Sequence, residues 1–345
     1  MFKGIFILIS CLFLTACSAH TSTISSNAAQ ISKLEQKTTP KRKNAESKAD
    51  VYQIYSPEAL TMLDTNQPIN VLASGFEWVE GPVWSVKNNG LLFSDIPQNK
   101  VYLYHHQHGL TEYLTRSGFS NGLVISPDNK LILMQSRSRQ IAKMLSELPL
   151  PRSEYEVLVN RYQGKRLNSP NDGVLASNGS LLFTDPPYGL AGKLNDPAKE
   201  LSFQGVYQLD KNNNLTLIDD SIVYPNGIAL SADQRTLYVA ASDPNKPAWY
   251  QYQLDENLQV INKNVFYELA AINENSHGLP DGLKIHPSGI IFATGPKGIF
   301  LFNPSGELLA NINLPSIAAN VAFNADYSML YITAHHQLLA IKLIK

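Results

Sequence analysis

Short runs of apolar residues, separated by polar turns, recur along most of the chain. One of them, Leu181–Phe183, is followed by Thr184 and Asp185, and similar runs rich in β-branched and aromatic residues occur elsewhere. Residues of this kind favour strands, and no long segment has the spacing of apolar positions that is typical of an amphipathic helix. The pattern therefore predicts an all-β fold.

The apolar runs are parts of a unit that occurs six times, at intervals of roughly 40 to 55 residues. Each unit consists of a polar turn, a β-like run, a tighter turn containing Gly, Asn or Asp, and a second β-like run. The polar turns and first runs fall at residues 80–84, 120–124, 171–174, 225–228, 280–283 and 319–322. This spacing is typical of a β-propeller with four-stranded blades and fits a sandwich or a solenoid less well. We predict a six-bladed β-propeller.

The start and the end of the domain are expected to meet. The sixth unit has room for only three strands, because its last apolar run is Leu338–Lys342. We expect Ile69–Ala73, from the start of the domain, to supply the fourth strand. Such pairing closes the ring and leaves no exposed sheet edge. The propeller domain is expected to extend over residues 51–345.

Polar residues occupy the same turn in all six units. In a propeller the innermost strands line the central channel, so the turns that lead into these strands open on one face. The residues at this position are Glu80, Asn121, Asn171, Asn226, Asp281 and Asn320. Asn-Gly and Asp-Gly are common turn dipeptides, so turn formation is an alternative role for these residues. Turn formation does not explain why Glu80 and Asp281 are carboxylates in a set that otherwise consists of amides.

The predicted shell contains two carboxylates and several amide oxygens, which suits Ca²⁺. A structural zinc site normally uses His or Cys, and none of the six positions supplies either. A cation placed near a lactone or ester would polarise the carbonyl group, and a carboxylate with a free oxygen could take a proton from the attacking water. We assign this second role to Asp281. Ser136 lacks a Gly-x-Ser-x-Gly context, so a serine hydrolase triad is not expected.

Several motifs, in order along the chain, closely resemble the gluconolactonase branch of the regucalcin-like family. The resemblance covers essentially the whole chain from about Leu72 onward. It implies a six-bladed propeller and a lactonase that depends on calcium or another divalent metal. The motifs that carry it are residues 80–84 with 93–95, 165–173 with 183–189, 225–227, and 279–282 with 293–295.

The resemblance also implies roles for individual residues. Glu80, Asn226 and Asp281 correspond to metal ligands, with Asp281 also the acid or base. Asn171 matches an Asn that contacts the substrate or the metal, and Arg166 is expected to orient substrate oxygens. Further candidates for substrate contact are Asn121 and Tyr188, with core packing as the alternative for Tyr188.

Two positions depart from the family pattern. Members of this branch often carry Glu-His where this chain has Gln135 and Ser136, and they tend to have Gly where this chain has Lys297. These differences bear on sugar-lactone specificity more than on metal binding. They also keep two alternatives open, which are organophosphate hydrolysis on the same metal site and a non-catalytic propeller that binds a ligand or partner at the cell envelope.

Residues 1–16 have the form of a signal peptide, because the apolar run Ile5–Leu14 follows a basic residue and is too short to span a bilayer. Leu14–Cys17 resembles a bacterial lipobox, which predicts cleavage before Cys17 and lipidation of that Cys. The alternative is cleavage elsewhere with an incidental Cys. Residues 17–50 are rich in small polar residues and predict a flexible tether. We therefore expect a lipid anchor in the cell envelope, on the periplasmic face of the outer membrane in a Gram-negative organism.

Composition excludes some partners. The formal net charge of the 345-residue chain is −1, and neither a basic helix nor zinc-finger spacing occurs, so nucleic-acid binding is not expected. Cys11 and Cys17 are the only cysteines, which predicts a domain without disulfides. The expected partners are a small lactone or ester and, through the lipid anchor, a membrane. The sequence sets no oligomeric state.

Overall fold

The computed structural model describes residues 51–272 and 277–344. The predicted signal peptide, the lipidation of Cys17 and the tether belong to residues 1–50 and lie outside the described residues. Helix is limited to two short 3-10 segments in the described residues, η1 (Pro57–Thr61) and η2 (Lys193–Asn195). None of the helices in this part of the chain is long and apolar enough to cross a membrane.

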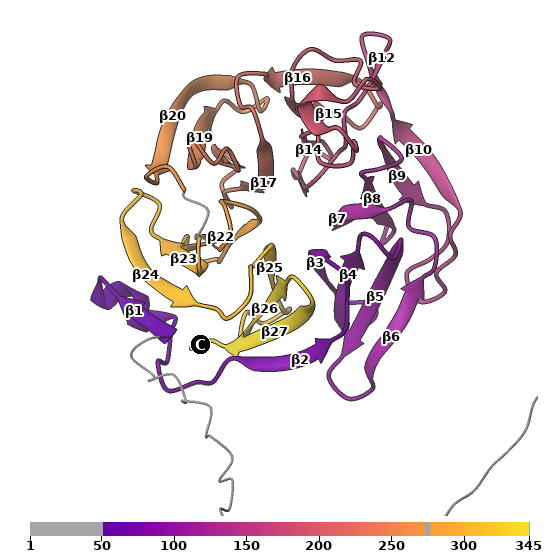
Figure 1. The fold of residues 1–345 in the computed structure, drawn as a ribbon. Coiled ribbons are helices and arrows are strands. Elements are labelled where there is room, and N and C mark those ends of the chain that lie inside the picture. Colours follow the sequence, from indigo (N-terminus) through magenta and orange to yellow (C-terminus); the bar gives the residue numbers. More distant parts are fainter. Residues whose placement is uncertain (1–50, 273–276, 345) are drawn as a thin grey trace, which may run out of the picture. The chain divides into compact units, whose positions relative to one another are not determined.

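Six antiparallel sheets are arranged in a ring around a central channel (Figure 1), which confirms the predicted six-bladed β-propeller. Within each blade, consecutive strands pair from the centre of the ring outward. Blade 1 contains β3 (Val79–Ser85), β4 (Gly90–Asp95), β5 (Lys100–His105) and β6 (Gly109–Leu114). Blade 2 contains β7 (Ser120–Ile125), β8 (Leu131–Gln135), β9 (Gln140–Met144) and β10 (Tyr155–Val159). Blade 3 contains β13 (Gly173–Leu175), β14 (Leu181–Asp185), β15 (Gly205–Leu209) and β16 (Leu215–Asp219). Blade 4 contains β17 (Pro225–Leu230), β18 (Thr236–Ala241), β19 (Ala248–Leu254) and β20 (Val260–Glu268). Blade 5 contains β21 (Leu283–Ile285), β22 (Ile291–Gly295), β23 (Gly298–Phe302) and β24 (Leu308–Asn313). Blade 6 contains β25 (Asn320–Phe323), β26 (Met329–Ala334), β27 (Gln337–Lys342) and β2 (Asn70–Ser74).

The ring is closed by a strand from the start of the domain, as predicted. β2 pairs antiparallel with β27, with Asn70 opposite Ala340 and Ser74 opposite Gln337. A second strand of the same segment, β1 (Tyr52–Ile54), pairs with β24 and adds a fifth strand to blade 5. This extra strand was not predicted from the sequence. The N-terminal segment of the domain thus joins the outer edges of blades 5 and 6 (Figure 1).

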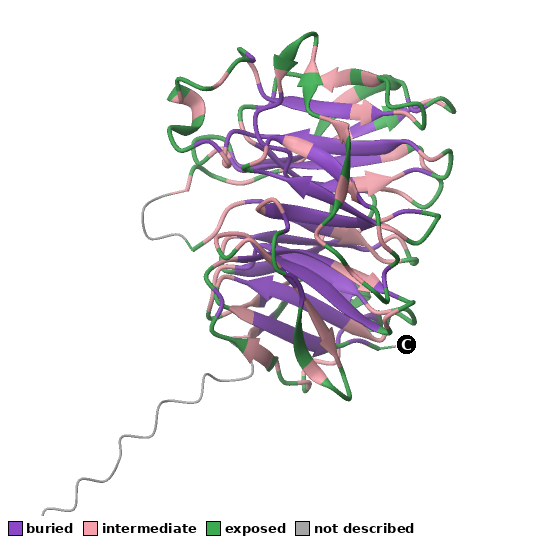
Figure 2. Cartoon of the chain, turned by 90° about the vertical axis from the view of Figure 1, so that its right-hand side faces the viewer, coloured by how far each residue is buried: buried purple, intermediate pink, exposed green. Residues whose placement is uncertain are grey.

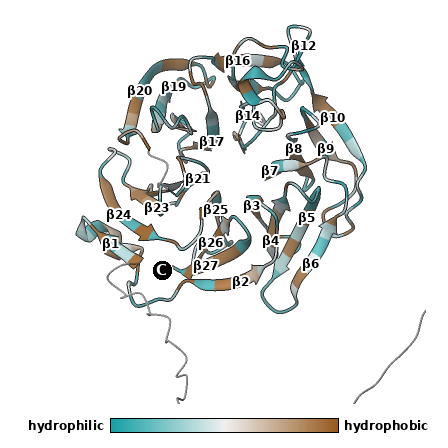
Figure 3. Ribbon diagram, viewed as in Figure 1, coloured by the Kyte–Doolittle hydropathy of each residue, from teal (hydrophilic) through white to brown (hydrophobic). Residues whose placement is uncertain are grey.

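The hydrophobic core lies between neighbouring blades. One cluster joins Leu182 of blade 3 to Ile228 and Val239 of blade 4, and every one of these residues is fully buried. Inner strands such as β4 are buried along their whole length, whereas loops and outer strands are largely exposed (Figure 2). Hydrophobic and hydrophilic segments alternate along β24 (Figure 3), where buried and half-buried residues also alternate.

A small hairpin lies outside the blades. It consists of β11 (Arg161–Tyr162) and β12 (Lys165–Arg166), and it leads into the inner strand of blade 3. The turn that follows is fixed by a buried carboxylate. Asp185 accepts hydrogen bonds from the main-chain N–H groups of Asn168 and Ser169, both at 2.7 Å. Asp185 thus braces this turn.

Candidate functional site

A cavity of about 700 Å³ opens at the end of the channel where the inner strands begin. Its lining includes five of the six polar positions that the repeat marked out, each from a different blade. These residues are Glu80, Asn121, Asn171, Asn226 and Asp281. The sixth position, Asn320, is buried and is not part of the cavity lining.

Glycines next to the site residues let neighbouring blades approach each other closely. A Cβ atom on Gly227, beside Asn226, would lie 2.2 Å from the carbonyl oxygen of Asp281 in the next blade. A Cβ atom on Gly81 would lie 2.0 Å from the carbonyl oxygen of Asn121. Gly81 has a φ angle of 56°, whereas Gly227 does not have a positive φ. At Gly227 the residue type is therefore required for space between blades and not for a left-handed turn.

Hydroxyl groups on the second strand of a blade hold the main chain of the site residue in the following blade. The Ser94 hydroxyl donates to the carbonyl oxygen of Asn121 at 2.8 Å. The Thr184 hydroxyl donates to the carbonyl oxygen of Asn226 at 2.6 Å. These bonds cross from blade to blade, so they fix the positions of the site residues relative to one another.

The orientation of the Asn226 side chain is set by Ser242. Asn226 Nδ2 donates to Ser242 Oγ at 2.9 Å, and Ser242 Oγ donates to the carbonyl oxygen of Pro280 at 2.5 Å. Because the nitrogen of the amide is used in this way, Asn226 Oδ1 is left without a hydrogen-bond partner in a buried position. Ser242 was not singled out by the sequence, because only the fold brings it beside Asn226.

Two further oxygens of the cavity lining have no hydrogen-bond partner. They are Asn121 Oδ1 and Asp281 Oδ1, and both are buried. Buried polar atoms in proteins are nearly always paired, so three orphaned oxygens around one cavity require an explanation. An electropositive ligand in the cavity would give such oxygens a partner.

The carboxylates of the site are held in a poorly solvated environment. Burial raises the pKa of Glu80 to about 7. Burial also raises the pKa of Asp281 well above its usual range, and the negative charges of Glu80 and Asp172 add to this effect. In their charged forms these groups repel one another, and a cation between them would remove that repulsion.

The residues present fit a hard divalent cation. The orphaned atoms are oxygens of amides and a carboxylate, which are typical ligands of Ca²⁺. Among the described residues, no group of three or more His, Cys, Asp or Glu side chains could hold a metal. A cation at this position would therefore be held by a mixed set of two carboxylates and amide oxygens, without His or Cys.

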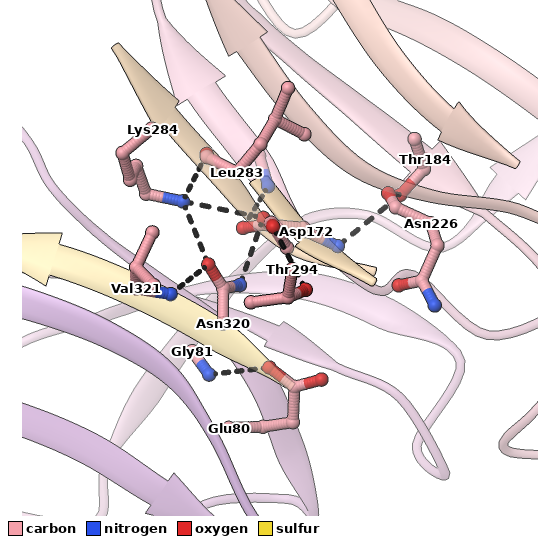
Figure 4. A network of polar contacts seen from close by, with 12 residues as sticks. Glu80, Gly81, Asp172, Thr184, Asn226, Leu283, Lys284, Thr294, Asn320 and Val321 are labelled. Carbon is pink, nitrogen blue, oxygen red and sulfur yellow. Dashed lines mark hydrogen bonds and ion pairs between the residues drawn. The ribbon is translucent and has the colours of Figure 1, made fainter. Parts of the chain in front are cut away.

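A second polar network fills the channel beside Glu80 (Figure 4). Lys284 Nζ lies 3.5 Å from Asp172 Oδ2 and 3.2 Å from Asn320 Oδ1, and Asn320 Nδ2 donates to Asp172 Oδ2 at 3.1 Å. Asp172 Oδ1 accepts a hydrogen bond from Gly173 N at 2.8 Å, so Asp172 braces its own turn. It also links blade 3 to blades 5 and 6, which the sequence did not reveal.

Comparison with known proteins gives this architecture a family. Residues 78–336 match the region described as "SMP-30/Gluconolactonase/LRE-like". The chain belongs to this family. It is 36% identical over 305 residues to the gluconolactonase of Zymomonas mobilis, with 84% of this chain and 85% of that protein covered.

Solved structures of the family have the same fold. A gluconolactonase from Xanthomonas campestris superposes with a TM-score of 0.75 and 28% identity, covering 85% of this chain and 95% of that chain. A regucalcin from Agrobacterium tumefaciens, described as a calcium-binding protein, superposes with a TM-score of 0.65 over 80% of this chain and 95% of that chain. Its sequence identity is 17%, so this second likeness supports the fold alone.

The two departures from the family pattern lie outside the cavity lining. Gln135 is buried and donates from Nε2 to the carbonyl oxygen of Ser117 at 2.9 Å, so it supports the loop before β7. Lys297 lies in the tight turn between β22 and β23 with a φ angle of 69°. This is the left-handed region that glycine adopts without strain, which explains why Gly suits the position.

The remaining candidate residues differ in their relation to the cavity. Tyr188 belongs to the lining, and its ring stacks on Tyr224 with centroids 5.7 Å apart. Arg166 is not part of the lining, and its guanidinium group donates to the carbonyl oxygen of Ser138 at 3.1 Å. The position of Arg166 in the hairpin β11–β12 directs it to a neighbouring loop.

Proposed function

We propose that this protein is a calcium-dependent hydrolase of a lactone or a related ester. The observation that carries the proposal is the set of orphaned oxygens on Asn121, Asn226 and Asp281, beside the Glu80 carboxylate, in one cavity. Family membership supports lactone hydrolysis, since the relative from Zymomonas mobilis is a gluconolactonase. The choice of Ca²⁺ is supported by the donor set, which consists of carboxylate and amide oxygens.

In this proposal Glu80, Asn171, Asn226 and Asp281 hold the cation. When bound, the cation supplies a Lewis acid that polarises the substrate carbonyl group and stabilises negative charge on its oxygen. We also assign to Asp281 the role of accepting a proton from the attacking water, through the carboxylate oxygen that does not bind the cation.

The substrate is positioned by the side chains that surround these ligands. Asn121 and Asn171 present amide groups to the cavity, and Tyr188 forms part of its wall. Arg166 is left out of this mechanism, because it is not part of the cavity lining and its guanidinium group donates to the carbonyl oxygen of Ser138.

The proposal is tested by hydrolysis of a panel of lactones and esters with Ca²⁺ and with EDTA. We expect EDTA to abolish turnover and added Ca²⁺ to restore it. Asp281→Asn should lower kcat by about 10²- to 10⁴-fold with little change in melting temperature, because the general base is lost while the shape is kept. Asp220→Asn, at an exposed position outside the cavity, is the control and should retain its activity.

Turnover that survives EDTA would exclude the metal mechanism. If the Ca²⁺-loaded protein hydrolyses organophosphates but no lactone, it is an organophosphate hydrolase that uses the same metal site. A folded protein that binds Ca²⁺ and hydrolyses nothing would be a binding propeller.

We also propose that the protein is exported and anchored in the cell envelope through a lipid on Cys17, at the outer membrane in a Gram-negative organism. The lipobox-like sequence before Cys17 supports this. Cys17→Ser should move the protein from the membrane fraction to the soluble periplasmic fraction, because the lipid acceptor is lost. Membrane association that is unchanged in Cys17→Ser would refute the anchor.

A further inference from the structure

The cavity is chemically divided into a polar floor and an apolar wall. Wall residues precede floor residues by two positions in two blades, with Trp78 before Glu80 and Leu279 before Asp281. Trp78 comes just before β3 and Leu279 comes before β21, so both apolar residues lie nearer the loops than the carboxylates do. The wall thus lies on the loop side of the point where the inner strands begin.

Loops from the second strands complete the wall. Asp95 at the end of β4 pairs with Val79 at the start of β3, which brings Ile96 beside Trp78. Ile96 N donates to the carbonyl oxygen of Trp78 at 3.1 Å. Further apolar residues of the cavity lining are Pro97, Pro244 and Ile317.

Some polar groups of the described lining are already engaged in hydrogen bonds within the protein. Ser242 uses its hydroxyl between Asn226 and Pro280, and Lys193 is the only residue of the described lining with a formal positive charge. A polyhydroxylated substrate would bury hydroxyl groups against the apolar wall without partners, which is unfavourable. An apolar group placed there would instead gain from leaving water.

The volume of the cavity also exceeds what a lactone ring needs. At about 700 Å³ it falls within the range typical of pockets that bind drug-sized ligands. A lactone whose ester group contacts the floor leaves the space beside Trp78, Ile96 and Ile317 available for a substituent. That space is lined by aromatic and branched aliphatic side chains.

From this division we infer that the enzyme acts on lactones that carry an apolar substituent, an alkyl chain or an aromatic ring, in preference to sugar lactones. The ester group lies on the polar floor, and the substituent packs against Trp78, Ile96, Leu279 and Ile317. The inference rests on the proposed lactone hydrolysis and adds the class of substrate.

The first test is a series of δ-lactones with alkyl substituents of increasing length, compared with glucono-δ-lactone in the presence of Ca²⁺. We expect kcat/KM to rise about two- to four-fold for each added CH₂ group until the wall is covered, because each group leaves water. Hydrolysis of glucono-δ-lactone with no rise along the alkyl series would overturn this inference alone. If no lactone is hydrolysed, the proposed function is wrong, and the inferred substrate class is wrong as well.

The second test uses matched substitutions of isoleucine. Ile317→Asn and Ile96→Asn should each reduce the ratio of kcat/KM between the longest alkyl lactone and the unsubstituted lactone by about ten-fold, because both place an amide in the apolar wall. Ile261→Asn changes the same residue type on the outer strand β20, where Ile261 is 66% exposed, and should leave the ratio unchanged. If the ratio of kcat/KM is the same in the two wall variants as in Ile261→Asn, Ile96 and Ile317 do not contact the apolar substituent.

Binding of the products gives a readout that does not depend on turnover or on how well a variant folds. Calorimetric titration of the Ca²⁺-loaded wild-type protein with the corresponding alkyl hydroxy acids should show affinity rising with chain length and a negative heat-capacity change, the sign of apolar burial. Affinity that is independent of chain length would overturn the inference.

Discussion

At the scale of single residues, the site depends on side chains that orient other side chains. Ser242 determines which atom of Asn226 is free, since its hydroxyl oxygen accepts the Asn226 Nδ2–H group. Without that bond the amide could rotate and present its nitrogen, which repels a cation. Loss of a group that orients a metal ligand in this way typically lowers metal affinity or activity by about 10- to 100-fold.

We predict that Ser242→Ala lowers the affinity for Ca²⁺ by about 10- to 100-fold while the fold is retained. Calorimetric titration of the metal-free protein measures this. Ser231→Ala removes a hydroxyl from the same blade outside the cavity and serves as the control. An affinity equal to that of the wild type in Ser242→Ala would show that Asn226 does not need this support.

The sequence could predict the residues that recur, and it could not predict those that act through contacts between blades. Asn226 and Asp281 occupy the same position of the repeat, so their convergence follows from the fold. Ser242 and Lys284 stand outside that pattern, and their partners are 16 and 36 residues away in the chain. Arg166 was assigned by resemblance, and the structure directs it to Ser138.

At the scale of strands and turns, the close approach of neighbouring inner strands positions the site. A glycine at 227 lets the backbone of the turn before β21 pass close by, so that Asp281 reaches the cavity. The Asn-Gly dipeptide at this position is thus a spacing device between blades, and turn formation alone does not account for it.

We predict that Gly227→Ala destabilises the protein by about 3 kcal/mol or more, because the new Cβ would overlap the carbonyl oxygen of Asp281. Gly109→Ala is the comparison, since Gly109 has a φ angle of 74° and open space around its Cβ position. That variant should cost only about 1 kcal/mol of backbone strain. Chemical denaturation of both variants measures the difference, and equal costs would refute the role of close approach.

Strand prediction succeeded where the pattern was repeated and failed where it was not. The strands that begin each unit and β2 were expected from the apolar runs. β1 has only three residues and pairs with β24, which lies far along the chain. Nothing local marks such a short segment as a strand, because its pairing depends on an edge that the rest of the fold creates.

At the scale of the whole molecule, buried carboxylates link stability to pH. Burial raises the pKa of both Glu80 and Asp185 to about 7, and that of Asp281 well above its usual range. Unfolded carboxyl groups release their protons near pH 4. Between about pH 4 and pH 7 the folded protein therefore binds more protons than the unfolded chain, so its stability falls as the pH rises through this window.

We predict that the melting temperature in EDTA decreases by about 5 °C or more between pH 5 and pH 8. Exposed acids with lowered pKa values, such as Asp210, change the stability only below about pH 4. They therefore do not oppose the decrease in melting temperature between pH 5 and pH 8. Added Ca²⁺ should restore stability at pH 8, since it binds only the folded protein. In Glu80→Gln the melting temperature should fall less between pH 5 and pH 8 than in the wild type. A melting temperature that rises from pH 5 to pH 8 would contradict the link between the buried carboxylates and stability.

The pairing of β2 with β27 has a consequence for the order of folding. The two strands lie at opposite ends of the domain, so β2 is synthesised first and its partner β27 last. The blades between them can form from local hairpins while the ribosome is still at work, but the ring cannot close until β27 has emerged. A contact between segments so distant in sequence is slow to form. Until β2 pairs with it, the exposed edge of β27 can pair with strands of other chains. The first strand of the ring to be made is thus the one that completes it.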